Sequence, residues 1–222
     1  ETIISFLEKV TNQISKNGFD AGIIVVDDGS PDGTAELIND FSKTHPNVTL
    51  LNRREKRGLA SACVYGFSYT KSPILGVMDA DLSHAPGALP YLLNPLLHNM
   101  CDIAVGSRYV PGGRILNWPF SRYMQSRLAC AVGSLLTSIK DVTSGFFFFK
   151  REVIDEVQLD PLGFKICLEI LVKGNYQTVM EVPYTFCDRI SGKSKMGMKQ
   201  IIEYGKQLKR LYKYKKKRNV QL

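Results

Sequence analysis

Apolar runs alternate with amphipathic patterns along most of the chain. Helical spacing of apolar residues predicts helices over residues 3–17, 34–45, 59–71 and 86–99. Short apolar runs bounded by polar turns predict strands over 21–28, 48–53, 73–79 and 102–108, and Phe146 to Phe149 are interpreted as strand core. Strands that are apolar throughout are typical of a parallel sheet covered on both faces. The pattern therefore predicts an α/β fold with a largely parallel sheet.

Polar turns follow three of the predicted strands, and in such sheets ligands bind at the carboxyl ends of strands. The segment GVMDADLSHAP places Asp79 and Asp81 one residue apart, so in extended backbone both carboxylates point to the same side. Two close carboxylates repel each other unless a cation lies between them. Oxygen ligands on a short turn favour Mg²⁺ or Mn²⁺, while a capping turn at a strand end explains the same residues equally well.

The other two turns also have two interpretations. In VVDDGSPDGT, Asp27 and Asp28 either accept hydrogen bonds from a base or ribose, or form an Asx turn that caps a helix. In GSRYVPGGR, Arg108 and Arg114 either hold a phosphate or are ordinary loop arginines. A Walker loop is absent, and no G-x-G-x-x-G follows a strand.

The composition shows a net positive charge, and the sequence shows where along the chain it is concentrated. The 222 residues are 44% hydrophobic, enough for one sizeable core, and the net charge is +8. Eight cations and no acidic residue lie between 206 and 218, so the rest of the chain is neutral: Lys206, Lys209, Arg210, Lys213, Lys215, Lys216, Lys217 and Arg218.

Apolar residues at helical spacing begin ahead of the basic segment and continue into it, namely Ile201, Tyr204, Leu208 and Leu211. An amphipathic helix with a basic face suits an anionic membrane surface, and a solvated surface helix that packs its apolar stripe on the body fits as well. Nucleic-acid binding is a weaker third option because no RNA- or DNA-binding motif accompanies the charge.

The cysteines and the hydropathy bear on the compartment. The five cysteines form no C-x-x-C pair and are odd in number, so we expect reduced, mostly buried thiols in a cytosolic setting. The chain opens without the pattern of a cleavable signal, and no apolar run reaches the length of a membrane span.

Seven blocks, taken in order, carry a resemblance over almost the whole chain. They are VVDDGSPDGT, NRREKRGLASACVYGF, MDADLSHAP, GSRYVPGG, DVTSGFFFFKREV, GFKICLEILVKG and VPYTFCDRISGKSKM. Together they resemble the family-two glycosyltransferases of GT-A fold, and most closely the dolichol-phosphate (polyprenyl-phosphate) mannosyltransferases.

The resemblance implies a Rossmann-like, doubly wound GT-A domain over residues 1–196 and a basic amphipathic helix and tail over 197–222 at the membrane surface. It implies transfer of a mannosyl residue from GDP-mannose to dolichyl or polyprenyl phosphate, with inversion and with Mg²⁺ or Mn²⁺. The implied location is the cytosolic face of a membrane, either endoplasmic reticulum or prokaryotic inner membrane. Membrane helices or subunits outside this chain are implied partners, and nucleic acid is not.

The resemblance also assigns residues by position. The nucleotide sugar is placed near Asp27, Asp28, Asp79 and Asp81, and the metal on Asp79 and Asp81. Ser83, which stands where many relatives have Gln, is a further position for a metal ligand. The acceptor phosphate is placed on Arg108, Arg122, Ser126, Arg189 and Lys195, and the catalytic set is Asp81, Arg108, Arg122 and Arg189.

The chemistry agrees with this assignment. A phosphate monoester is already anionic near neutral pH, so it needs no dedicated general base. A divalent cation stabilises the charge that develops on the departing diphosphate, and three arginines orient the acceptor and screen its repulsion from the donor. His84 and Glu169 are interpreted as structural: His84 as a cap or a surface hydrogen bond, and Glu169 as part of an ion pair or as an orienting group.

Three alternatives remain open. Related polyprenyl-phosphate glucosyltransferases, which use UDP-glucose, share most of these blocks. A nucleotidyltransferase would also pair carboxylates with Mg²⁺, and a noncatalytic membrane-surface module would use the basic segment alone.

Sheets of the family begin with an apolar strand that ends in a P-x-x-N-E turn. Because ETIISFLEKV resembles the helix after that turn, we expect this chain to start beyond the family's first strand.

Overall fold

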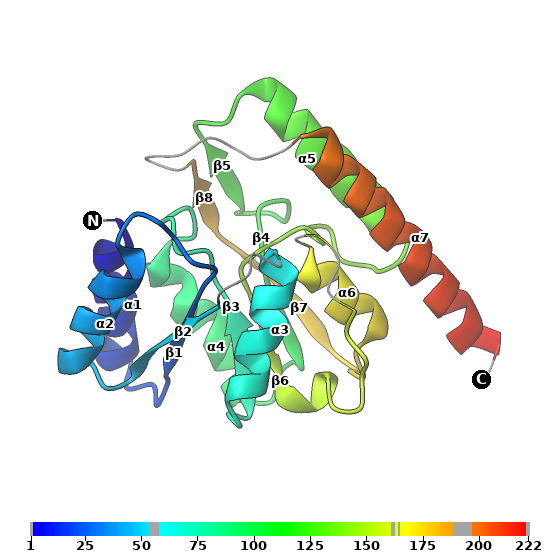
Figure 1. Ribbon diagram of the computed structural model, residues 1–222. Coiled ribbons are helices and arrows are strands. Elements are labelled where there is room, and N and C mark those ends of the chain that lie inside the picture. The colour runs from blue at the N-terminus through cyan, green and yellow to red at the C-terminus, as the bar shows by residue number, and fades with distance from the viewer. Residues whose placement is uncertain (1, 54–57, 161–162, 164, 189–196, 221–222) are drawn as a thin grey trace.

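The computed structural model describes residues 2–53, 58–160, 163, 165–188 and 197–220. Helices lie on both sides of a layer of strands (Figure 1). The helices are α1 Thr2–Lys16, α2 Thr34–Thr44, α3 Leu59–Tyr69, α4 Leu89–Leu97, α5 Phe120–Gly133, α6 Ile166–Lys173 and α7 Met198–Val220. The strands are β1 Ile23–Asp27, β2 Val48–Asn52, β3 Ile74–Val77, β4 Ile103–Ser107, β5 Arg114–Leu116, β6 Phe147–Lys150, β7 Val179–Pro183 and β8 Thr185–Cys187.

The predicted elements agree with those observed, with one difference in helix type. The segment 86–99, predicted as one helix, begins with the 3₁₀ turn Pro86–Ala88 and continues as α4. Pro90 stands in the first turn of α4, where its missing N–H has no intrahelical partner to lose, whereas Pro95 lies inside the helix near its end.

The strands form three ladders. β1 and β2 are parallel, β5 and β8 are parallel, and the four-stranded sheet has the order β3-β6-β4-β7. Within that sheet β4 and β7 are parallel, whereas β6 is antiparallel to both β3 and β4. The α/β class with parallel-rich sheets is confirmed. The reversed direction of β6 was not predicted, because a buried strand is apolar throughout whichever way it runs.

Strand β6 shows why both faces of the sheet are buried. Phe147 and Phe149 belong to a core cluster with side chains from α3, α5, α6 and α7. Phe146 belongs to a second cluster with side chains from α1, α2 and α4, and Phe148 packs against that cluster. Successive side chains of a strand point to opposite faces, so four consecutive phenylalanines fill both cores, as the strand-core interpretation predicted.

Helix α7 packs on the body through part of its apolar stripe and lies alongside α5 (Figure 1). Leu211 is 2% exposed, Tyr204 and Leu208 pack against the same core cluster, and Ile201 is 55% exposed. The Tyr204 hydroxyl donates to the Ala129 carbonyl of α5 at 2.8 Å. A Cβ at Gly133 of α5 would lie 2.7 Å from that hydroxyl, so the close approach of the two helices requires glycine there.

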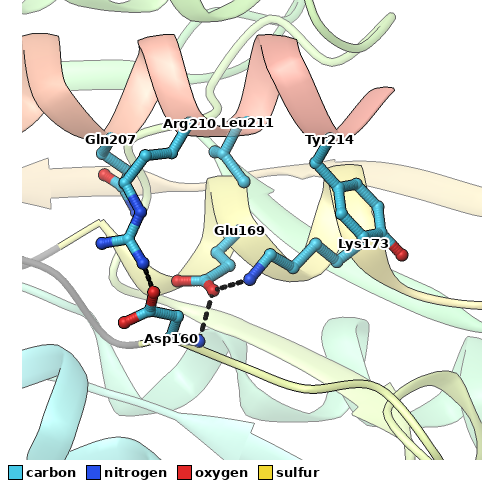
Figure 2. Close-up of a pocket in the computed structure, with 7 residues that line it drawn as sticks. All are labelled: Asp160, Glu169, Lys173, Gln207, Arg210, Leu211 and Tyr214. Atoms are coloured by element: carbon cyan, nitrogen blue, oxygen red, sulfur yellow. Dashed lines mark hydrogen bonds and ion pairs between the residues drawn. The ribbon is translucent and has the colours of Figure 1, made fainter. Parts of the chain in front are cut away.

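A small pocket separates α7 from α6 (Figure 2). The buried Glu169 accepts from the Lys173 ammonium at 2.7 Å and from the Asp160 amide at 2.7 Å, while Arg210 of α7 pairs with Asp160. Burial raises the pKa of Glu169, and the hydrogen bond from Lys173 opposes that rise. Glu169 is thus a member of a structural ion pair within α6, one of the roles predicted for it, and Arg210 of α7 pairs with the neighbouring Asp160.

All five cysteines are free thiols, and three of them, Cys101, Cys130 and Cys167, are buried. Among the residues that the structure describes, no helix combines the length and the apolar character that crossing a bilayer requires.

Candidate active site

Asp79 and Asp81 lie on the turn that follows β3, and the turn is held at both ends. The Asp79 amide donates to Nδ1 of His84 at 3.0 Å. The Asp81 carboxylate accepts from the Ser83 amide at 3.0 Å and from the Ser83 hydroxyl at 2.5 Å. Leu82 between them has a φ of 62°, a left-handed conformation that a leucine adopts only where its surroundings enforce it.

His84 is buried, rather than at the surface, and it caps the turn from within. Its ring stacks on Phe146 with centroids 5.1 Å apart and meets Tyr184 and Phe186 edge-on. Burial lowers the pKa of His84, although the charges of Asp79 and Asp81 pull it up. The neutral ring accepts at Nδ1, so the hydrogen-bond pattern assigns its proton to Nε2, which faces Asp79 at 3.9 Å.

This turn fits a hard divalent cation that takes only part of its ligands from the protein. Two carboxylates and a hydroxyl are oxygen donors, the kind that Mg²⁺ and Mn²⁺ prefer. A Cβ at Gly145 would lie 3.1 Å from a carboxylate oxygen of Asp79, so glycine leaves open the space beside that oxygen. No group of three or more His, Cys, Asp or Glu side chains suited to a metal occurs among the described residues.

Asp27 and Asp28, at the end of β1, both have partners. The buried Asp27 carboxylate accepts from the Gly29 and Ser30 amides at 3.0 and 2.9 Å, which is an Asx turn. Asp28 accepts from Nε of Arg53 at 2.6 Å, and Arg53 also donates to Ser61 of α3 at 2.9 Å. Asp27 therefore shapes the turn, while Asp28 and Arg53 present a paired acceptor and donor beside it.

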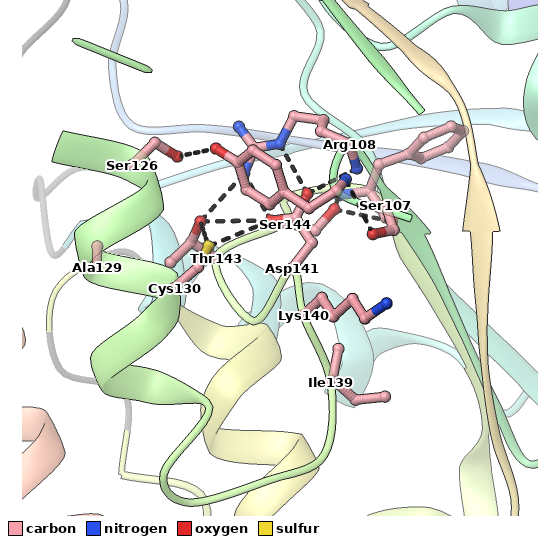
Figure 3. Close-up of polar contacts among 12 residues, drawn as sticks. Ser107, Arg108, Ser126, Ala129, Cys130, Ile139, Lys140, Asp141, Thr143 and Ser144 are labelled. Carbon is pink, nitrogen blue, oxygen red and sulfur yellow. Dashed lines mark hydrogen bonds and ion pairs between the residues drawn. The ribbon is translucent and has the colours of Figure 1, made fainter. Parts of the chain in front are cut away.

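Arg108 follows β4 and is locked onto Asp141 (Figure 3). Its Nε and Nη2 donate to the two Asp141 carboxylate oxygens at 2.7 and 2.6 Å, and Nη2 also donates to Thr143 at 3.1 Å. Burial alone would lower the pKa of Arg108, but the hydrogen bonds and charge of Asp141 raise it above its usual range. The Nη1 group is the part of the guanidinium that neither Asp141 nor Thr143 holds.

Arg122 and Ser126 lie one turn apart on α5, as predicted, and make different contacts. Arg122 donates to Asp188, just beyond β8, at 2.6 Å, and both side chains are partly exposed. The Ser126 hydroxyl accepts from the Tyr109 hydroxyl at 2.7 Å. Arg114 lies on β5 and is exposed. Arg189 and Lys195 fall outside the described residues.

Two residues near this cluster were not predicted. Trp118 lies under both arginines: the guanidinium carbon of Arg122 is 4.3 Å and that of Arg108 is 5.4 Å from its ring centroid. Lys165, at the start of α6, donates from its ammonium to the Thr143 carbonyl at 3.2 Å. Burial and the charge of Arg108 lower the pKa of Lys165 to about 8. The signal available for Trp118 was a lone tryptophan between Arg114 and Arg122, whereas Lys165 lies in the block GFKICLEILVKG, which did not single it out.

Strand β8 joins the acidic turn of Asp79 and Asp81 to the arginines. The Cys187 amide donates to the Ser83 carbonyl at 3.2 Å, and His84 forms an antiparallel bridge with Phe186. On its other side Phe186 meets Trp118 edge-on, with centroids 5.1 Å apart. The acidic turn therefore lies on one side of β8, and Arg108, Arg122 and Trp118, which form the arginine cluster, lie on the other.

Comparison with known proteins identifies the family. The family model described as glycosyl transferase family 2 matches residues 1–158. The chain belongs to glycosyl transferase family 2. It is 42% identical over 218 residues to a dolichol-phosphate mannosyltransferase of Pyrococcus furiosus, covering 96% of this chain and 61% of that protein. It is 39% identical over 192 residues to a polyprenol monophosphomannose synthase of Mycolicibacterium smegmatis, covering 82% and 72%.

A solved structure supports the fold of this family-two chain. A mannosyltransferase of Pyrobaculum calidifontis, solved in complex with GDP-Man and Mn²⁺, superposes with a TM-score of 0.57 at 18% identity. The match covers 93% of this chain and 61% of that one. The GT-A fold expected from the motifs is thereby confirmed.

Proposed function

We propose that the protein transfers a mannosyl residue from GDP-mannose to a polyprenyl or dolichyl phosphate, with inversion at the sugar. The observation that carries the proposal is the 42% identity over almost the whole chain to a dolichol-phosphate mannosyltransferase. The site supports it, because strand β8 lies between a turn bearing two carboxylates and a pair of arginines, which suits a donor site beside an acceptor site.

Asp79 and Asp81 are the proposed ligands of Mg²⁺ or Mn²⁺, and Ser83 orients Asp81 through its hydroxyl. When bound, the cation offsets the negative charge that develops on the departing diphosphate. Asp28, paired with Arg53, lies at the end of a parallel strand, where it is suited to accept hydrogen bonds from the nucleoside. Asp27 contributes by shaping that turn.

Arg108, Arg122, Ser126, Arg189 and Lys195 are the proposed acceptor-phosphate residues. Asp141 holds Arg108 in one orientation before any ligand arrives, so little rotamer freedom is lost on binding. A phosphate oxygen attacks the anomeric carbon and the bond to the diphosphate breaks, so the configuration inverts. Because that oxygen carries no proton near neutral pH, the mechanism needs no general base.

The outer surfaces of α5 and α7 support peripheral contact with a membrane through the basic amphipathic helix and tail of residues 197–222. Helix α5 exposes an apolar stripe at four-residue steps, namely Phe120, Met124 and Leu128, and Leu135 is exposed just beyond the helix. Exposed cations line the adjoining α7, among them Lys213, Lys216 and Lys217. Apolar side chains beside a basic helix fit an anionic bilayer surface, where the lipid phosphate is displayed.

The test supplies the full-length protein with polyprenyl phosphate, Mn²⁺ and either labelled GDP-mannose or labelled UDP-glucose, and follows label into the organic phase. We expect transfer from GDP-mannose alone, abolished in Asp81→Asn but retained in the control Asp155→Asn, which lies far along the chain from the turn. Transfer from UDP-glucose alone would replace the mannosyl assignment with a glucosyl one. Label that stays in water with both donors, in a folded protein, would refute the lipid acceptor.

A further inference from the structure

The only tryptophan of the chain lies at the centre of the arginine cluster. Trp118 immediately precedes Pro119 and α5, which carries Arg122, and its ring also faces Arg108, which follows β4. Two guanidinium groups from distant parts of the sequence therefore share one indole. The negative face of an indole attracts cations, so the ring holds together two charges that would otherwise repel each other.

A second observation concerns the indole N–H of Trp118. It is buried, and it has no hydrogen-bond partner among the residues that the structure describes. Indole nitrogen only donates, and a buried donor normally has an acceptor, so this one is suited to a ligand that brings an oxygen. Next to two guanidinium groups, an anionic oxygen is the acceptor that fits.

The neighbouring aspartates orient the two arginines. They do not explain why a tryptophan with an unpaired N–H lies between the arginines. Asp141 accepts from two guanidinium nitrogens and the backbone amide of Arg108, and Asp188 accepts from one guanidinium nitrogen of Arg122. Phe186 packs edge-on against Trp118 and fixes the plane of the ring. An indole held this firmly, with its polar edge unpaired, is preorganised for binding rather than left over from core packing.

We propose that Trp118 is a phosphate-binding residue of the acceptor site. Its N–H donates to an oxygen of the lipid phosphate, and its ring positions Arg108 and Arg122 around the same group. This assignment rests on the proposed function, because it takes the arginine cluster to be the site of the acceptor phosphate. Trp118 then distinguishes a phosphate monoester, which presents oxygens to both arginines and the indole, from an uncharged alcohol.

The first experiment observes the indole directly. The ¹⁵N-labelled full-length protein, with GDP and Mg²⁺, is titrated with a short, water-soluble prenyl monophosphate, and the indole signal that is absent from W118F is followed by NMR. We expect that signal to move downfield and to saturate together with binding measured by calorimetry. The corresponding prenyl alcohol is the control ligand and should leave the signal in place.

The second experiment separates the N–H from the ring. Because a hydrogen bond to a charged group is lost, we expect W118F to raise the KM for the prenyl phosphate about tenfold with kcat within about twofold. The KM for the donor should not change. W118L removes the ring as well and should lower kcat too, since the arginines lose their support. Tyr91→Phe, which removes one polar hydrogen from an exposed aromatic side chain on α4, is the matched control.

The outcomes keep this inference apart from the proposed function. Prenyl phosphate that binds and reacts while the indole signal stays still, or a W118F enzyme with an unchanged acceptor KM, would overturn the role of Trp118 and leave the mannosyltransferase intact. Calorimetry that shows no binding of prenyl phosphate to the folded protein would overturn both. If W118F fails to fold, the Trp118 indole signal is assigned by its absence from Trp118→Tyr. The titration of the wild-type protein with prenyl phosphate then decides whether the indole N–H binds the phosphate.

Discussion

Single residues decide how the arginine cluster is built, and Asp141 is the clearest case. Its carboxylate is fully buried and holds Arg108 by three hydrogen bonds, two from the guanidinium and one from the backbone amide. The DVTSGF block marked this residue in the sequence, but its partner 33 positions away was not apparent, since nothing in a linear pattern pairs two loops. The same holds for Trp118, whose neighbours come from β4, α5 and β8.

Replacing Asp141 tests this arrangement. We expect Asp141→Ala to lower the free energy of unfolding by about 3 to 5 kcal/mol, because it leaves a buried guanidinium unpaired. Urea denaturation followed by circular dichroism measures the change. Asp141→Asn, which keeps an acceptor but not the charge, should cost less, and a loss below about 1 kcal/mol in the alanine variant would contradict the role given to the pair.

Among the secondary-structure elements, three strands are tied together by one aspartate. Asp102, which precedes β4, accepts from Lys150 at the end of β6 and from the Gln177 and Thr178 amides before β7. Burial alone would raise the pKa of Asp102, but these hydrogen bonds outweigh it and lower the pKa to about 2. The ionised carboxylate is therefore a fixed link between neighbouring strand ends.

The link predicts a pH dependence with a defined sign. A pKa lowered in the folded state stabilises the protein above the ordinary value of about 4, and the contribution disappears as the pH falls toward about 2. At pH 7 we expect Asp102→Asn to be less stable than the natural protein by about 2 kcal/mol. The difference in the free energy of unfolding between the two proteins, measured by urea denaturation at a series of pH values, should decrease below about pH 4. A gap that stays constant down to pH 3 would show that Asp102 does not titrate in this way.

Two apolar residues of α7 should contribute differently to stability, because one is buried and the other is exposed. Leu211 is buried against the core, so we expect Leu211→Ala to destabilise the protein by about 2 to 4 kcal/mol. Ile201, from the same predicted stripe, is exposed, and Ile201→Ala should change stability by less than about 0.5 kcal/mol. Thermal unfolding of both variants measures the difference. Equal effects would mean that α7 does not pack as described.

For the molecule as a whole, the separation of charge predicts salt-sensitive binding to anionic vesicles. We expect the triple change of Lys213, Lys216 and Lys217 to Gln to reduce the free energy of binding to phosphatidylserine vesicles by about 2 to 3 kcal/mol at about 0.1 M salt, and little at about 0.5 M. Co-sedimentation with the vesicles measures the binding. The control changes Lys9, Lys16 and Lys71 to Gln, two exposed lysines of α1 and one in the loop after α3, with the same loss of charge. If both triple variants lose binding equally, net charge matters and the position of α7 does not.

Local patterns were sufficient for the α/β class, for most helices and strands, and for the acidic turn, because apolar periodicity and turn residues act over a few neighbouring positions. The motifs in order were sufficient for the family. Long-range packing determined the rest: the reversal of β6, the seat of α7 on the core, the burial of His84 and the convergence of Arg108 and Arg122 on Trp118. These features depend on contacts between residues far apart in the chain, whose energies come from burial and pairing that no local pattern records.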